Sequence, residues 1–102
     1  MRIVIHPKGN RDGKLADVEL QFDEGDLAGL KLTGIAVWAD RRTGEPSSVT
    51  FPSRKYTPTG SNEERTYTML RAQRDPRALD VLRGKILAEY KRTASMSVYA
   101  RG

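Results

Sequence analysis

The chain has 102 residues, of which 37% are hydrophobic and 30% charged, and a net charge of +5, which is typical of one soluble globular domain. The absence of cysteine excludes disulfides and thiolate metal sites, and no apolar run approaches the length of a transmembrane helix. The N-terminal apolar stretch is too short for a signal peptide, so we expect a cytoplasmic bacterial protein with no membrane partner.

Alternating apolar and polar residues predict five short strands. These strands are residues 2–6, 14–22, 30–38, 48–51 and 66–70. The first is expected to stop at Pro7, and the clearest, residues 14–22, has one apolar face. The alternation slips around Gly34, which indicates either a β-bulge or a neighbour packed close to the backbone. A hairpin at residues 41–46 and a polar loop at residues 57–65 separate the later strands.

The C-terminal third predicts one α-helix. Asp75 is a typical N-cap, and Pro76 suits the first helical position, where a missing amide hydrogen costs nothing. The apolar stripe of this helix consists of Leu79, Leu82, Ile86, Leu87 and Tyr90. We expect the helix to end near Arg92, so that residues 1–92 form one domain and residues 93–102 a flexible tail. The predicted fold class is α+β, with an antiparallel sheet of about five strands and a C-terminal helix packed on one face.

Catalysis is not expected, and neither is a cofactor, a metal or a small-molecule substrate. His6 is the single histidine and stands at a strand end with no partner nearby in the sequence. Neither a Ser-His arrangement nor a phosphate-binding loop is present in the sequence. Asp23, Glu24 and Asp26 lack the spacing of a calcium loop and fit an exposed turn better. An enzyme or metal protein that uses these three carboxylates remains an alternative.

The positive charge belongs to the second part of the chain, and it indicates an anionic partner. Residues 1–40 carry five Lys and Arg against seven Asp and Glu, and residues 41–102 carry thirteen against six. Such a basic half most often binds nucleic acid, although a solubilising surface has the same composition. Arg54 and Lys55 follow Pro52, and we expect them to project from a rigid corner at the end of an edge strand.

The candidate nucleic-acid-binding residues extend from this corner to the hairpin and to the helix. They are Arg41, Arg42, Arg54, Lys55, Tyr56, Arg71, Arg74, Arg77 and Lys85. Tyr56 and Tyr67 lie near the basic residues and could stack on unpaired bases, but Tyr67 is expected instead to pack half-buried on the sheet, and Trp38 in the core. Pairing of Arg54 and Lys55 with the glutamates at 63 and 64 would weaken this surface.

The stretch Phe51-Pro52-Ser53-Arg54-Lys55 resembles the signature of the SpoVG family (stage V sporulation protein G, septation regulators), in which a hydrophobic residue precedes Pro-Ser-Arg-Lys. The likeness covers roughly residues 2–92, including the helix ending "ILAEY". The chain departs from the family at residues 66–71, where members have an Asp-Ile…His-Pro stretch, and in its more basic hairpin. The resemblance implies a small dimeric regulator that binds DNA and RNA. By position, the family's nucleic-acid contacts would correspond to Arg54 and Lys55 and, more loosely, to Arg71, Arg74 and Arg77.

The main alternative is a non-catalytic homodimeric protein–protein interaction module. On the helix face opposite the apolar stripe, Gly84 and Ala88 are small residues framed by cations. Such a face allows close approach of a phosphate backbone or of another protein surface. Edge strands of the predicted sheet offer a second place for a protein partner.

Overall fold

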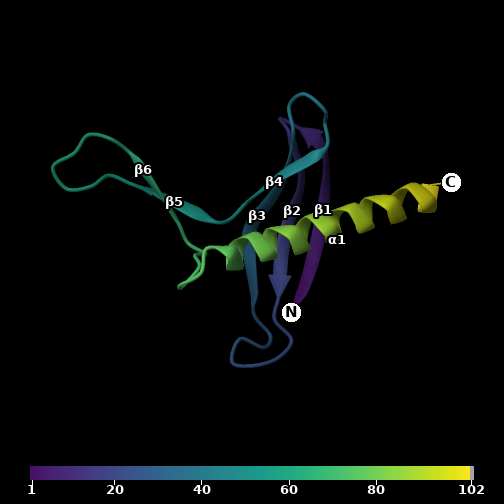
Figure 1. Cartoon of the computed structure of the whole chain (residues 1–102), viewed down its shortest axis with the longest axis horizontal. Helices are drawn as coiled ribbons and strands as arrows, with labels where there is room; N and C mark the ends of the chain where they lie inside the picture. Colours follow the sequence, from purple (N-terminus) through teal and green to yellow (C-terminus); the bar gives the residue numbers. More distant parts are fainter. Residues whose placement is uncertain (102) are drawn as a thin grey trace.

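The computed structural model describes residues 1–101, with the side chains of residues 1–9 and 12–95. The elements are β1 (Arg2–Arg11), β2 (Lys14–Gln21), β3 (Lys31–Ala39), β4 (Pro46–Thr50), β5 (Ser53–Tyr56), β6 (Arg65–Thr68) and α1 (Arg77–Arg101). Strands β1 to β4 form one antiparallel sheet in chain order, and β5 and β6 form a separate two-stranded ribbon (Figure 1). The predicted α+β class is therefore confirmed, but the strands form two sheets, because the chain leaves the main sheet after β4.

Strand β1 runs through Pro7 instead of stopping there. Pro7 pairs with Ala16 of β2, and β1 lies at the edge of the sheet, where a missing amide hydrogen is tolerated. The pairing then becomes irregular between Pro7 and Arg11. Asp12 and Gly13 follow with φ values of 56° and 86°, the geometry of a two-residue type I′ hairpin turn.

A β-bulge surrounds Gly34 in β3. Val18 pairs with Ile35 and Leu20 with Leu32, so β3 has one extra residue in this interval. Gly34 has a φ of +90°, and a Cβ added there would lie 3.1 Å from the Cβ of Pro52. Both explanations of the slipped alternation are confirmed, since the strand is bulged and a neighbour packs against its backbone.

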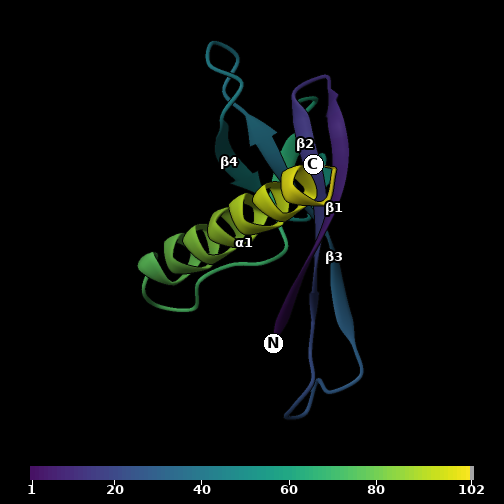
Figure 2. The ribbon, with the colours of Figure 1, turned by 90° about the vertical axis from the view of Figure 1, so that its right-hand side faces the viewer.

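Helix α1 crosses one face of the main sheet (Figures 1 and 2) and contacts both edge strands, β1 and β4. Ile86 is 0% exposed and joins Val18, Ile35 and Val37 in the core. The other residues of the predicted apolar stripe pack at the margin of this core, so the stripe is confirmed. The helix therefore packs on one face of the sheet through the apolar stripe that its sequence predicts.

The predicted start of α1 is also confirmed, but its predicted end is not. The backbone N–H of Arg77 donates to Oδ1 of Asp75 at 3.0 Å, as expected of an N-cap. The helix continues past Arg92 to Arg101, because no proline or glycine interrupts residues 93–101. The domain limit at residue 92 and the flexibility of the tail stay predictions, and Gly102 lies outside the described residues.

A buried carboxylate links three neighbouring strands of the main sheet. Oε1 of Glu19 on β2 lies 2.8 Å from Nε2 of His6 on β1, and Oε2 lies 3.0 Å from Nζ of Lys31 on β3. These are diagonal cross-strand neighbours, which sequence alone does not reveal. Hydrogen bonding from His6, and then from Lys31, lowers the pKa of the Glu19 carboxyl.

We expect Glu19→Gln to lower the free energy of unfolding at pH 7 and to have less effect in acid. Because the pKa of Glu19 is lower in the folded protein, its ionised form stabilises the fold above the unfolded pKa of about 4.3. This contribution is lost as the pH falls through the folded pKa. Urea denaturation at pH 7, 5, 4 and 3 measures it. A difference between variant and parent that stays constant down to pH 3 would contradict the assignment.

Candidate nucleic-acid interface

The two-stranded ribbon of β5 and β6 lies away from the main sheet and the helix (Figure 1). Every residue of both strands is exposed. Its root is fixed, because Phe51 is buried just before β5 and the backbone N–H of Met69 donates to the carbonyl of Pro52 at 2.8 Å. A two-stranded ribbon alone is at best marginally stable in water, so the order of this arm depends on its anchored root.

The pairing register divides the side chains of the ribbon between two faces. Arg54 pairs with Tyr67, and Tyr56 pairs with Arg65. Because paired residues point to the same side and alternate residues share a side, these four side chains lie on one face. We call them, together with Met69, the aromatic face. The opposite face consists of Ser53, Lys55, Thr66 and Thr68.

A shallow hollow of about 340 Å³ opens on the aromatic face. It is lined by Arg54, Tyr56, Tyr67 and Met69. Tyr56 is 40% exposed, Tyr67 44% and Met69 55%, so three large apolar side chains meet solvent together. The expectation that Tyr67 packs on the main sheet is wrong, because the ribbon has left that sheet. Pro52 follows the end of edge strand β4, as predicted, but Arg54 and Lys55 lie within strand β5 and not at a corner.

Cationic groups surround the rings of this face. The guanidinium carbon of Arg71 lies 4.9 Å from the centroid of the Tyr67 ring, a cation–π contact. Among the described residues, Arg54 has no acidic partner. Arg65 is exposed at the end of the loop and stands opposite Tyr56. The ribbon thus combines three arginines with two tyrosines on one surface.

Lys55 lies on the opposite face of the ribbon and is paired with an acidic residue. Its Nζ is 3.4 Å from Oε1 of Glu64, and the two side chains are 76% and 60% exposed. An ion pair so exposed contributes about 0–1 kcal/mol, so a phosphate can replace Glu64 at low cost. The ion pair with a neighbouring glutamate that the sequence suggested is therefore present for Lys55 but not for Arg54.

The remaining candidate cations are not gathered around the ribbon. Arg77 forms an ion pair at the start of α1, where its Nη2 lies 2.9 Å from Oδ2 of Asp75. Hydrogen bonding from Arg77 lowers the pKa of Asp75. Arg74 is exposed in the connection before α1, and Lys85 is exposed on the helix. The predicted cations at 41 and 42 lie in the β3–β4 hairpin, at the opposite end of β4 from the ribbon (Figure 1).

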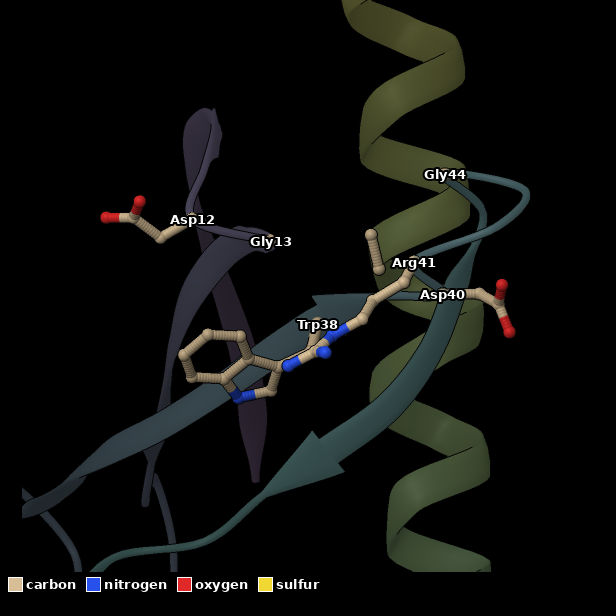
Figure 3. A pocket seen from close by; sticks show the side chains of 7 residues that line it. Asp12, Gly13, Trp38, Asp40, Arg41 and Gly44 are labelled. Atoms are coloured by element: carbon tan, nitrogen blue, oxygen red, sulfur yellow. The ribbon is translucent and has the colours of Figure 1, made fainter.

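That hairpin borders a second hollow of about 520 Å³, beside the β1–β2 turn (Figure 3). Its lining consists of Asp12, Gly13, Trp38, Ala39, Asp40, Arg41 and Gly44. Trp38 is half-buried here instead of in the core, and its indole N–H donates to Oγ1 of Thr50 at 2.7 Å. Asp40 accepts backbone hydrogen bonds from Arg42 and Thr43, which shape the hairpin. The charges are mixed, so this hollow has no single electrostatic preference.

The described part of the chain contains neither a cluster suited to a metal ion nor a helix suited to crossing a membrane. No group of three His, Asp or Glu side chains in this part of the chain is placed to hold a metal ion. The acidic turn of Asp23, Glu24 and Asp26 is exposed. As far as the structure describes the chain, α1 lacks the apolar length that crossing a membrane requires.

The structure brings together part of the predicted surface and adds to it. Arg54, Tyr56 and Arg71 lie around one hollow or ring, as a binding surface requires. Arg65, Tyr67 and Met69 join them, although the sequence did not single them out as candidates. The signal that finds them is the hairpin pairing of residues 53–56 with 65–68, which places alternate residues of both segments on one side.

Comparison of the chain with protein-family models, with curated proteins and with solved structures found no match. The resemblance to the SpoVG family therefore stays a prediction.

Proposed function

We propose that this chain is a small, non-catalytic regulatory protein that binds nucleic acid through the β5–β6 ribbon and acts in the bacterial cytoplasm. The observation that carries the proposal is the aromatic face, where Arg54 and Arg65 stand opposite Tyr67 and Tyr56 on strands with no buried residue. Arg71 extends it at the end of β6. Cations and flat rings on one exposed surface are the combination that binds phosphates and bases.

The ribbon suits this role because it holds its cations on regular backbone. A guanidinium donates two parallel hydrogen bonds to a phosphate, and less entropy is lost when the backbone is already ordered. Ladder pairing of β5 with β6 and the anchored root at Pro52 supply that order. The net charge of +5 adds long-range attraction for a polyanion.

Salt dependence of binding is the first test. We expect fluorescence anisotropy with labelled mixed-sequence duplex and single-stranded DNA to show micromolar-range, weakly sequence-selective binding. If ~4–6 phosphates are neutralised, the duplex affinity falls about 150- to 1,800-fold between 50 and 200 mM salt. Arg54→Ala/Lys55→Ala should weaken binding more than tenfold and reduce the slope of log K against log salt by about 2.

The matched control is Arg41→Ala/Arg42→Ala, which removes the same charge from the far end of β4. Equal losses in the two double variants would assign binding to overall charge and not to the ribbon. Absence of salt-dependent binding to either DNA would contradict the proposed function. Self-association that persists at high salt, without DNA binding, would favour the homodimeric interaction module, for which exposed Val81 beside Gly84 on α1 offers a surface.

A further inference from the structure

We infer that the aromatic face selects unpaired bases, so that the preferred ligand is single-stranded nucleic acid and not duplex. This inference rests on the proposed function and specifies its ligand class. It follows from which atoms the face exposes and from how its two rings are spaced.

The hollow on the aromatic face exposes apolar atoms more than polar ones. Its lining includes the rings of Tyr56 and Tyr67 and the thioether of Met69, all more than one-third exposed. In a duplex, stacking covers the flat faces of the bases, and the grooves present polar edges. A tyrosine ring packs on the face of a base only after that base has left the stack.

The two tyrosines lie diagonally across the ribbon, since Tyr56 pairs with Arg65 and Tyr67 lies two residues further along β6. The backbone positions of diagonal neighbours in an antiparallel pair are about 7–8 Å apart. This spacing is about twice the 3.4 Å separation of stacked bases, so the two rings can take positions on either side of one base. The spacing therefore favours a flexible strand whose bases can be splayed.

Arginines stand where the phosphates of such a strand would pass. Arg54 is opposite Tyr67 and Arg65 is opposite Tyr56, so each ring has a cation beside it. Arg71 lies over the Tyr67 ring at 4.9 Å and restricts its motion before any ligand arrives. Alternating rings and cations along a groove are the arrangement by which proteins hold single strands without reading sequence.

The opposite face of the ribbon offers a different chemistry and a built-in control. It presents the hydroxyls of Ser53, Thr66 and Thr68 and the ammonium of Lys55, without an aromatic ring. Base stacking is therefore confined to one side of the arm, and a leucine placed on either side tests this directly.

The experiment compares a labelled 15-nucleotide oligothymidine, which cannot pair with itself, with a labelled 15-base-pair duplex at one salt concentration. The parent protein should bind the oligothymidine more tightly. Tyr67→Leu should weaken that binding between about 5- and 100-fold and duplex binding less than about 2-fold, because stacking is lost but charge is kept. Tyr56→Leu should act in the same way, and Tyr67→Phe, which keeps a ring, should stay close to the parent. Thr68→Leu on the opposite face should change neither affinity.

Three results would overturn the inference while leaving the proposed function in place. They are a parent preference for the duplex, an equal loss on both ligands in Tyr67→Leu and Tyr56→Leu, or no loss on either ligand. Failure of the parent protein to bind either DNA at low salt would overturn the proposed function, and the inference with it.

Discussion

Ile86→Ala is expected to lower the free energy of unfolding by about 2–5 kcal/mol. Ile86 is 0% exposed at the place where α1 meets the sheet, and its neighbours in the core include Ile35 and Val37. The substitution removes apolar area from the core and leaves a cavity that the close-packed strands cannot fill. Urea denaturation followed by far-UV circular dichroism measures the loss.

Val81→Ala is the matched control, because Val81 lies on the same helix and is 57% exposed. We expect it to change the free energy of unfolding by less than about 0.5 kcal/mol. Similar costs for the two variants would mean that α1 does not pack on the sheet through Ile86. Below its unfolding transition, Ile86→Ala should keep the DNA affinity of the parent, since no residue of the aromatic face belongs to α1.

The elements that bury one face could be predicted from the sequence. Helix α1 has both a capping residue, Asp75, and an apolar stripe whose central residue, Ile86, is buried in the core. Strand β2 shows a period of two in polarity, because Ala16, Val18 and Leu20 lie in the core and alternate along the strand with Asp17, Glu19 and Gln21. The bulge at Gly34 could be predicted for the same reason, since it interrupts an otherwise regular alternation of apolar and polar residues. An element with one buried face therefore shows a regular spacing of apolar residues in its sequence.

The ribbon could not be predicted in this way because neither of its faces is buried. Residues 53–56 carry no apolar alternation, so the pattern ended at Phe51 and indicated a corner. Which side chains share a face depends on the register of β5 with β6, and this register brought Arg65 and Tyr67 beside Arg54. The contact of Glu19 with His6 depends on register in the same way.

Gly34→Ala tests how the main sheet positions the ribbon, and we expect it to cost about 2–4 kcal/mol of stability. The φ of +90° is strained for any residue with a Cβ. The new Cβ would also stand 3.1 Å from the Cβ of Pro52, inside ordinary contact distance. Pro52 must then shift, and because its carbonyl accepts the hydrogen bond from Met69, both strands of the ribbon shift with it.

Gly29→Ala separates the two contributions. Gly29 has nearly the same φ, +87°, but an added Cβ there meets nothing within 4 Å. It should therefore cost only about 1–2 kcal/mol, and the excess in Gly34→Ala measures the contact with Pro52. Because the ribbon root moves in Gly34→Ala alone, only this variant should also weaken oligothymidine binding, by a few-fold under conditions where it is fully folded. If both variants lower the free energy of unfolding equally and leave oligothymidine binding unchanged, Gly34 is needed only for the backbone conformation of the bulge. Its contact with Pro52 then does not position the ribbon.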